Sequence, residues 1–504
     1  MSKKPNYDET FCGKLPLHNI NLIQPHGCLL VFDRDTLEII QVSENSKDLL
    51  GVTPEEALGQ SLQQWIDVPA TRITDKFQSG IGDRLPFYLH FTAAGVTRQY
   101  LVLIHARLDY LVAECFPADR KENAFVEIYQ TLKHSFAEIE HTSTVAEMSA
   151  VVTRQLREIS DFDRVLLYQF DKDWNGKVIA ESKTEGLNGY LGQQFPASDI
   201  PKQARAMYRK NTYRMIPDRD YTPVKLYPVI NPRTNAFTDL SDCSIRSVAP
   251  VHLEYLKNMD VAASMSFRVL WGEQLWGLIS LHHRQPRFLD YETCSLFELL
   301  SSFISNHLST ILSREHFHFA AGLQEKKAAI QKNAYQHTAL APALLEQDIK
   351  VTDLFRASGA ALLLQNRIHT TGTVPPGEFI EHVGFWLQSK DFDTVFAAQH
   401  FAGIFEEAGE YAAIASGFLA LTLNKEEGEF LLLFRPEQAS TISWGGNPGD
   451  AVRFEADQKT YHPRNSFEVF QEQVRQTSED WQPEELNIAR ELRNFLFEFL
   501  VKHR

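Results

Sequence analysis

The chain has 504 residues, of which 43% are hydrophobic and 23% charged, which is ordinary for a globular protein of roughly two to four domains. Acidic residues outnumber basic ones by 65 to 50, so the formal charge of −15 argues against nucleic acid or an anionic membrane surface as a general partner. The sequence contains no signal peptide and no run of about eighteen apolar residues, so we expect a cytoplasmic protein without a membrane span.

The first segment, residues 1–118, is predicted to be a small α+β domain. A helical pattern over residues 53–66 opens with Thr53-Pro54, a pair typical of a helix start. Turn residues separate three β-rich runs around this helix, at residues 27–33, 38–45 and 98–116. Strands around a few short helices are typical of small sensor domains.

The second segment, residues 119–315, combines an amphipathic helix with two predicted hairpins. The helix covers residues 124–140, and its apolar face comprises Phe125, Ile128, Tyr129, Leu132, Phe136 and Ile139. The hairpins lie at residues 164–182 and 263–284. Between them, residues 216–250 hold five prolines and no helical pattern. An irregular insertion of this length is uncommon in a compact domain and is usually functional.

The third segment, residues 316–504, is entered through a long helix, because the span from Arg287 to Ala341 contains no proline. Two strands are predicted, at residues 357–368 and 428–437. A second unusual stretch between Arg435 and Phe467 predicts a long hairpin or an extended arm. The chain ends in an amphipathic helix, residues 484–504, which we expect to continue into a further module.

The five cysteines are few and widely spaced and form no C-x-x-C pair, so neither a disulfide framework nor a zinc site is expected. Cys12 lies in the polar N-terminal segment. From local sequence alone it is an unremarkable thiol in a mobile tail. The alternative is a nucleophile for a covalently bound cofactor.

Asp199 and the basic residues that follow it also have two interpretations. Asp199 precedes Pro201 at a helix start, where it is either a capping residue or a group at the mouth of a pocket. Several arginines and tyrosines follow, between Tyr208 and Tyr221, and Arg246 comes after them. They form either a solvated basic face or a set of hydrogen-bond donors for the carboxylates of a ligand.

The remaining polar groups are weaker signals. His252 and His282 stand beside apolar runs, where lone histidines are usually satisfied core or rim groups, and their spacing gives no reason for a metal site. Arg464 and Ser466 share one side of an extended chain, which fits a plain edge strand. No Ser-His-Asp order, Walker loop or G-x-G-x-x-G occurs, so no enzyme activity is predicted.

Taken in order, these motifs resemble the photosensory core of bacteriophytochromes, which has tandem PAS, GAF and PHY domains. The motifs occur in family order and span essentially the whole chain. They are Cys12 ahead of Ile23-Gln24-Pro25-His26-Gly27, then FPASDIP (195–201), RSVAPVHLEYLKNM (246–259), GEQLWGLISLHHR (272–284), Trp444-Gly445-Gly446 and HPRNSF (462–467).

The resemblance implies an α+β fold of three tandem domains, each an antiparallel sheet with helices, joined by long helices. The expected boundaries are 1–118 for the N-terminal segment and PAS domain, 119–315 for the GAF domain and 316–504 for the PHY domain. The resemblance also implies a figure-eight knot, in which the N-terminal segment passes through residues 216–250, called the lasso. The arm between Arg435 and Phe467 would be the PHY tongue hairpin.

The implied cofactor is biliverdin IXα, a linear tetrapyrrole in the GAF pocket that forms a thioether with Cys12. Relatives that bind phycobilins carry a cysteine directly before the pocket histidine, whereas here Val251 precedes His252, so that route is closed. Besides Cys12, the implied cofactor-binding residues are Tyr168, Tyr190, Phe195, Asp199, Ile200, Tyr208, Arg214, Arg246, His252, Tyr255, Ser264, Ser266 and His282.

By the same resemblance, each part of the pocket has a task. Arg214, Arg246 and Tyr208, with two serines, would bind the propionates. The Asp199 carbonyl and a water held by His252 would accept the pyrrole N–H groups. His282 would donate to the D-ring carbonyl, among Tyr168, Phe195 and Tyr255. This sequence departs from common family residues at Ala249, Tyr190 and Phe470, which we expect to tune the photoreceptor rather than change its class.

The implied function is a red/far-red photoreceptor in which light turns the double bond between the C and D rings from Z to E. The expected switch residues are Asp199, Trp444, Arg464 and Ser466, with Arg464 paired to Asp199 before the tongue changes shape. The final helix would signal to a histidine kinase or response regulator outside this chain, across a homodimer. A PAS/GAF module for a cyclic nucleotide or haem, and an enzyme, are the alternatives.

Overall fold

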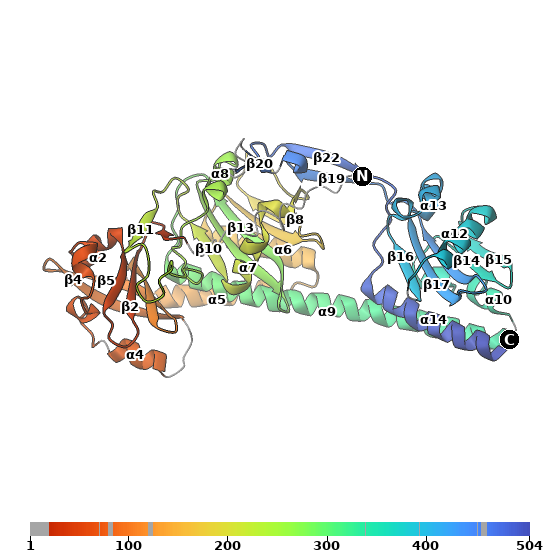
Figure 1. Cartoon of the computed structure of the whole chain (residues 1–504), viewed down its shortest axis with the longest axis horizontal. Helices are drawn as coiled ribbons and strands as arrows, with labels where there is room; N and C mark the ends of the chain where they lie inside the picture. The colour runs from red at the N-terminus through yellow and green to blue at the C-terminus, as the bar shows by residue number, and fades with distance from the viewer. Residues whose placement is uncertain are drawn as a thin grey trace. The chain divides into compact units, whose positions relative to one another are not determined.

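The computed structural model describes residues 20–69, 71–78, 84–118, 124–337, 339–392, 394–450, 452–454 and 461–503. Cys12 and the beginning of the predicted knot lie outside these residues. The chain divides into two compact units, Met1–Ile311 with Ser443–Phe470, and Leu312–Ile442 with Gln471–Arg504 (Figure 1). No helix in the described part of the chain is both long and apolar enough to cross a membrane.

The first sheet carries the N-terminal core. Its strand order is β1-β11-β3-β2-β6-β5-β4, and the printed pairings within it are antiparallel. The bounds are β1 Leu22–Ile23, β2 Cys28–Asp33, β3 Ile39–Ser43, β4 Arg84–Ala93, β5 Val96–Ala106, β6 Tyr110–Pro117 and β11 Val224–Tyr227. The short helices α2 (Lys47–Leu50), α3 (Pro54–Ala57) and α4 (Thr71–Gln78) accompany it. Alternate residues of β2 and β6 enter this core, and the others face the lasso.

Two expectations for this part need correction. The helix predicted over residues 53–66 is only α3 followed by a 3-10 turn, because Gly59 adopts a left-handed φ of 73°. The lasso is not wholly irregular, since β11 lies between Pro223 and Pro228 and pairs with both β1 and β3. The proline-rich stretch is therefore bound to the N-terminal sheet through a strand.

The second sheet has the order β10-β12-β13-β7-β8-β9-β19-β22. The bounds are β7 Arg164–Phe170, β8 Gly176–Lys183, β9 Gln194–Phe195, β10 Tyr213–Ile216, β12 Ala263–Trp271, β13 Gln274–His283, β19 Ser440–Gly445 and β22 Val469–Val474. The two predicted hairpins are β7–β8 and β12–β13. Residues from the predicted arm extend this sheet, because Trp444 in β19 pairs in parallel with Gln194 in β9.

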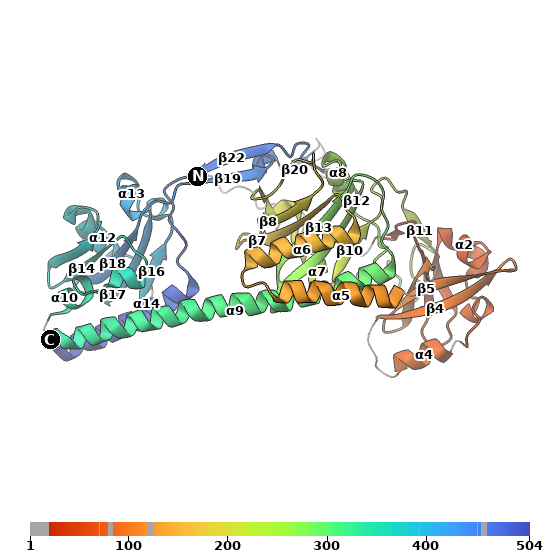
Figure 2. The same ribbon diagram turned by 180° about the vertical axis from the view of Figure 1, so that it is seen from behind.

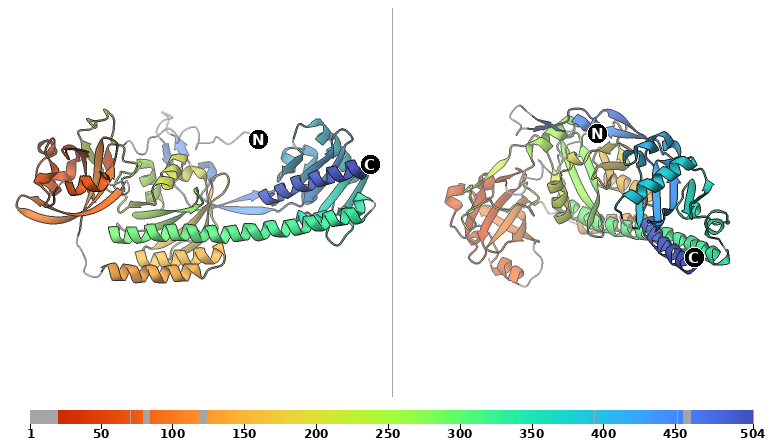
Figure 3. Two further views of the ribbon diagram at one scale, coloured as in Figure 1. Left: turned by 90° about the horizontal axis from the view of Figure 1, so that it is seen from below. Right: turned by 45° about the vertical axis from the view of Figure 1, so that its right-hand side comes forward.

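Helices cover both faces of the second sheet (Figures 2 and 3). One face carries α5 (Ala124–Glu140), α6 (Val145–Ser160) and the start of α9 (Tyr291–Gln336), and the other carries α7 (Lys202–Lys210) and α8 (Pro250–Asn258). Tyr129, expected on the apolar face of α5, is 57% exposed, which corrects that part of the helical pattern. The long predicted helix is α9, with 46 residues.

The second unit has a five-stranded antiparallel sheet in the order β15-β14-β18-β17-β16. The strands are β14 Gly359–Leu364, β15 Arg367–Gly372, β16 Val395–Ala398, β17 Gly417–Asn424 and β18 Glu429–Arg435. One face packs on α12 (Gly377–Ser389), and the other on α10 (Leu340–Leu345), the end of α9 and the final helix α14 (Pro483–His503). The predicted strands β14 and β18 and the final helix are present.

A buried arginine ties the base of the arm to the final helix. Arg435, the last residue of β18, donates to Glu485 Oε1 at 2.7 Å and to the Phe355 carbonyl at 2.7 Å. Its guanidinium lies 3.6 Å from the ring centroid of Trp481. The side chains of Arg435 and Glu485 are 3% and 0% exposed, and Arg356 also donates to Glu485 Oε1 at 3.2 Å, so the buried charge of Arg435 depends on this carboxylate.

Glu485→Ala is expected to destabilise the second unit by about 3 kcal/mol, because it leaves the buried Arg435 without its carboxylate. Glu491→Ala is the matched control, since Glu491 pairs with Lys327 but is 49% exposed, and its loss should cost less than about 1 kcal/mol. Urea unfolding curves of the two variants and the parent measure both values. Equal effects of the two substitutions would contradict this account of the Arg435 contact.

Candidate functional site

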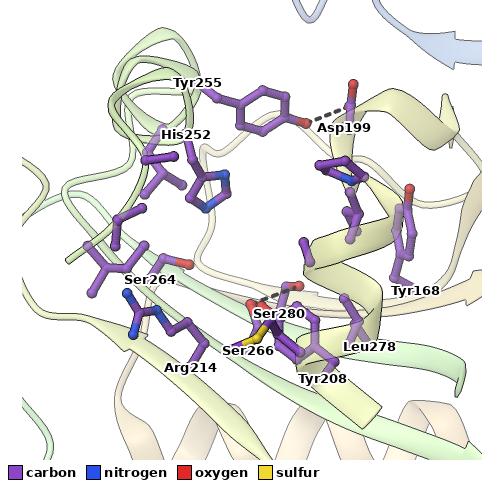
Figure 4. A pocket seen from close by; sticks show the side chains of 18 of the residues that line it. Tyr168, Asp199, Tyr208, Arg214, His252, Tyr255, Ser264, Ser266, Leu278 and Ser280 are labelled. Carbon is purple, nitrogen blue, oxygen red and sulfur yellow. Dashed lines mark hydrogen bonds between the residues drawn. The ribbon is translucent and has the colours of Figure 1, made fainter. Parts of the chain in front are cut away.

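A cavity of about 260 Å³ lies on the second sheet between α7 and α8 (Figure 4). One ordered water needs only about 10–15 Å³, so the cavity is large enough for an extended ligand. The residues that line it include twelve of the predicted cofactor-binding residues: Tyr168, Phe195, Asp199, Ile200, Tyr208, Arg214, Arg246, His252, Tyr255, Ser264, Ser266 and His282.

Strand register explains why polar groups gather on the face of the second sheet that lines the cavity. Arg214 in β10 is opposite Ser266 in β12, and Ser266 is opposite Ser280 in β13. Ser264 is in turn opposite His282. Residues two apart on a strand share one face, so both pairs on β12 and β13 point into the cavity. Ser280 was missed from the sequence, although its position two residues before His282 was a sufficient signal.

Some predicted residues lie outside the cavity. Tyr190 lines a neighbouring cavity of about 160 Å³, which shares His282 with the first. Its ring packs against Phe195 with a centroid distance of 5.8 Å, so it lies behind a residue that lines the main cavity. Trp444 and Ser466 belong to the arm and do not line the cavity, whereas Pro463 of the arm does.

Two arginines make the cavity positive. Burial and, to a smaller extent, the charge of neighbouring Arg214 together lower the pKa of Arg246 to about 9. Burial also lowers the pKa of Arg214. A pKa of about 9 keeps Arg246 charged at neutral pH. Asp199 is the only carboxylate among the described lining residues, and it is paired with Arg464. The charges of Arg214 and Arg246 therefore favour an anionic ligand.

Arg214 also binds backbone carbonyl groups of the lasso. It donates from Nη1 to the Ser244 carbonyl at 3.0 Å, and from Nη2 to the Ser247 carbonyl at 3.0 Å and to the Arg246 carbonyl. The guanidinium thus fixes the end of the lasso that carries Arg246. It offers five N–H donors in all, so carboxylate binding and backbone contacts are compatible.

The two histidines of the cavity are neutral. Burial lowers the pKa of His252 to about 4 and that of His282 to about 3, and nearby arginines act in the same direction. His252 stacks on Tyr255 with an interplanar angle of 11°. Nδ1 of His282 is buried and has no hydrogen-bond partner within the described residues. An unpaired buried polar atom costs about 1–3 kcal/mol, so a ligand that bonds to it would gain from doing so.

Asp199 accepts two hydrogen bonds from different parts of the chain. Tyr255 Oη donates to Asp199 Oδ2 at 2.8 Å, and Arg464 Nη2 from the arm donates to the same oxygen (Figure 4 shows the tyrosine contact). The side chains of Asp199 and Arg464 are 6% and 2% exposed. Burial raises the pKa of Asp199 against the pull of Arg464 and Tyr255. Burial likewise opposes the charge of Arg464, but Asp199 outweighs it and raises the arginine pKa.

Aromatic faces and a histidine–glutamate contact hold the arm at the cavity. The Arg464 guanidinium lies 5.7 Å from the ring centroid of Phe195 and 5.1 Å from that of Phe467. His462 Nδ1 is 2.9 Å from a carboxylate oxygen of Glu254 on α8. The expectation of Arg464 as a plain edge-strand residue is therefore wrong, because its side chain is fully buried against the second sheet.

The two glycines after Trp444 allow close approach, Gly445 between the arm and the second sheet and Gly446 between two parts of the arm itself. A Cβ on Gly445 would lie 2.6 Å from the ring of Phe195, and one on Gly446 would lie 2.4 Å from the Ser466 carbonyl oxygen. Gly446 also has a φ of 94°, which side chains rarely adopt. Gly445 is thus a steric requirement of arm docking, and Gly446 a requirement of the fold of the arm.

Comparisons with known proteins first define a three-domain sensory chain. Family models for the PAS fold, the GAF domain and the phytochrome region match residues 12–118, 144–308 and 323–504. Cyanobacterial phytochrome B of Nostoc sp. is 34% identical over 98% of this chain and 66% of the relative, so the chain spans just under two thirds of that protein. The bacteriophytochrome of Xanthomonas campestris pv. campestris is 31% identical over 99% of this chain and 79% of the relative.

Solved structures agree. A bacteriophytochrome from the photosynthetic bacterium R. palustris has a TM-score of 0.85 and 31% identity, covering 97% of this chain and 99% of that one. The photosensory core module of Stigmatella aurantiaca phytochrome has a TM-score of 0.83 and 31% identity, covering 98% of this chain and 99% of that one. The chain belongs to the phytochrome family and has its PAS-GAF-PHY core, as the resemblance predicted.

Gly445→Ala is expected to displace the arm, because its Cβ would meet the Phe195 ring. A clash of this kind costs about 1–3 kcal/mol, so amide exchange at Gly446, which donates to the Glu468 carbonyl, should quicken about tenfold. Hydrogen exchange with mass spectrometry measures it. Gly377→Ala is the control, because nothing lies within 4 Å of its Cβ. Unchanged exchange at Gly446 would contradict the steric argument.

Acidification should destabilise the chain without added ligand through His252. Its folded pKa is about 4 against an ordinary 6.5, so between these values the unfolded state binds more protons and stability falls as pH falls. At pH 5 the loss amounts to about 2 kcal/mol. Urea unfolding at pH 7 and pH 5 should show His252→Gln losing about 2 kcal/mol less than the parent. His134→Gln, at a side chain 70% exposed, is the control. Equal losses in His252→Gln and the parent would refute the assignment.

Proposed function

We propose that this chain is the sensory core of a red/far-red photoreceptor whose GAF cavity binds the linear tetrapyrrole biliverdin IXα. The observation that carries the proposal is the chemistry of the cavity. Arg214 and Arg246 line it, Asp199 is the only carboxylate among the described lining residues and is paired with Arg464, and a neutral His282 has a buried Nδ1 with no partner in the described residues. Biliverdin matches both features, because it brings two propionates and a ring carbonyl. When bound, it supplies visible absorption and Z/E isomerisation between its C and D rings.

The proposed tasks follow the positions of the side chains. Arg214, Arg246 and Tyr208 would bind the propionates, and Ser264 and Ser266 would complete that side of the cavity (Figure 4). Burial raises the pKa of the Tyr208 hydroxyl, so it stays a neutral donor.

The opposite side would hold the rings. The Asp199 carbonyl and a water held by His252 would accept hydrogen bonds from the pyrrole N–H groups. Ile200 would pack beside them. His282 would donate to the D-ring carbonyl. The walls near that ring would be Tyr168, Phe195 and Tyr255, with Tyr190 supporting Phe195 from behind.

Attachment is proposed through Cys12. Its thiol would add across the A-ring vinyl group, so that a carbon–sulfur bond forms and the thiol proton passes to the other vinyl carbon. The described cysteines are Cys28, Cys115, Cys243 and Cys294, and all are buried. Burial raises the pKa of each of these thiols, which suppresses the nucleophilic thiolate.

The Asp199–Arg464 pair is the proposed switch, with Ser466 and Trp444 providing contacts in the other state of the arm. We propose domain boundaries at 1–118, 119–315 and 316–504. The final helix would signal, in a cytoplasmic homodimer, to a histidine kinase or response regulator outside this chain. The chain itself would then be a sensor and not an enzyme.

The test is spectroscopic. The chain mixed with biliverdin should absorb red light, change its spectrum reversibly on illumination, and keep the pigment on the polypeptide during size exclusion in urea. Cys12→Ser should bind the pigment but release it in urea, because no thioether forms. Cys243→Ser, the control thiol, should retain it. Pigment that washes out of the parent would refute the thioether, and failure to take up biliverdin beside tight binding of a cyclic nucleotide would favour that alternative function.

A further inference from the structure

Glu114 is a fully buried carboxylate outside the cavity. It lies on β6, on the face that Tyr110 and Val112 turn toward the lasso, and it is 0% exposed. An acidic residue is almost never buried unless it is paired. The cavity contacts described above do not include it, so its place needs a separate explanation.

Three donors surround this carboxylate. His105 Nε2 on β5 is 2.7 Å from Glu114 Oε1, while Ser244 Oγ and the Ile245 amide of the lasso donate to Oε2, each at 2.8 Å. Burial alone would raise its pKa, but the His105 hydrogen bond and charge, together with the Arg84 charge and the Ile245 amide, lower it. Glu114 is therefore charged, and two of its bonds end on the lasso.

The lasso residues that Glu114 holds also meet the cavity. The Ser244 carbonyl accepts from Arg214, and Arg246, next to Ile245, lines the cavity itself. Gln24 supports the same stretch from the N-terminal side, since its backbone amide donates to the Ile245 carbonyl at 2.7 Å. Residues 244–247 are thus fixed by Glu114 from outside the cavity and by Arg214 from within.

Glu114 also supplies charge. It is one of the groups that oppose the lowering of the Arg214 pKa, so the carboxylate of the N-terminal sheet favours the charged form of a cavity arginine. His105, Glu114 and Cys243 place ligand-type atoms within 4.8 Å of one another, a grouping that a metal could also use. Both Glu114 oxygens already accept hydrogen bonds, and burial keeps Cys243 a thiol, so the hydrogen bonds account for the grouping.

We propose that Glu114 is a positioning residue for the carboxylates of the bilin. By anchoring residues 244–247, it sets Arg214 and Arg246 where two propionates meet them, so that the N-terminal domain tunes the affinity of the GAF cavity for an anionic ligand. This inference rests on the proposed function, because it assumes a bilin in the cavity.

The experiment compares biliverdin with its dimethyl ester, which has the same ring system but no free carboxylate. The full chain carrying Cys12→Ser binds reversibly and serves as the parent. Adding Glu114→Gln should weaken biliverdin binding about tenfold, the worth of a hydrogen bond to a charged group, and ester binding less than about twofold. Absorption titration gives the four dissociation constants. If Glu114 had a purely structural role, Glu114→Gln would weaken the binding of both ligands equally.

Two further variants secure the result. Asp33→Asn breaks another contact between the N-terminal sheet and the lasso, the Asp33–Arg233 pair, and should change both affinities by less than about twofold. Ser244→Ala removes one lasso donor and leaves the carboxylate intact, so it should weaken biliverdin binding about threefold with the same indifference to the ester.

The outcomes are distinct. Equal loss for both ligands, or no loss for biliverdin, in Glu114→Gln and Ser244→Ala overturns the positioning role while the proposed function stands. A stoichiometric divalent metal in the purified parent that Glu114→Gln removes also overturns it, in favour of a metal site. A parent that binds neither ligand refutes the proposed function and this inference with it.

Discussion

The buried pair of Asp199 and Arg464 is the interaction on which the arrangement of the cavity and the arm depends. Removing two charges from water costs several kcal/mol for each ion, and their attraction compensates only when geometry and further contacts are good. Here Tyr255 donates to the same carboxylate oxygen, and two aromatic rings face the guanidinium. Asp199 and Tyr255 also line the cavity, so one carboxylate connects the cavity wall with the arm.

The same pair decides the charge of the cavity. Because Arg464 neutralises Asp199, the positive charges of Arg214 and Arg246 face the cavity without an opposing lining carboxylate in the described chain. Glu114 lies outside the cavity and acts on these arginines through the lasso backbone. One arginine from the arm therefore neutralises the lining carboxylate, and one glutamate from the N-terminal sheet favours the charged form of Arg214.

The sequence predicted the regular elements well where patterns are local. Apolar runs with a turn gave β7–β8 and β12–β13, and the absence of proline gave α9. Patterns failed where tertiary contacts decide: β11 forms between two prolines because β1 and β3 pair with it. The arginines and serines of the site were reached through the resemblance, since spacing along the chain left each of them with a plain structural interpretation.

Asp199 and Glu114 show why local sequence was insufficient for the site. The cap position of α7 is Pro201, not Asp199, and the partners of Asp199 lie 56 and 265 residues further along the chain. Glu114 could have been flagged as a lone acid in an apolar strand, but its partners in the lasso are 130 and 131 residues away. Such contacts follow from the fold and not from periodicity.

A small displacement of the arm would be costly because of Asp199. If Arg464 moved away by a few ångströms, Asp199 would stay buried with only Tyr255 as its donor, which is the costly condition of an uncompensated charge. Gly445 also lies close to the second sheet, because a Cβ there would lie 2.6 Å from the ring of Phe195, so the arm has little room to move toward that ring. The arm is therefore stable when fully docked, or after Asp199 has gained another donor. In the switch proposed above, the release of Arg464 would therefore have to come with another donor for Asp199.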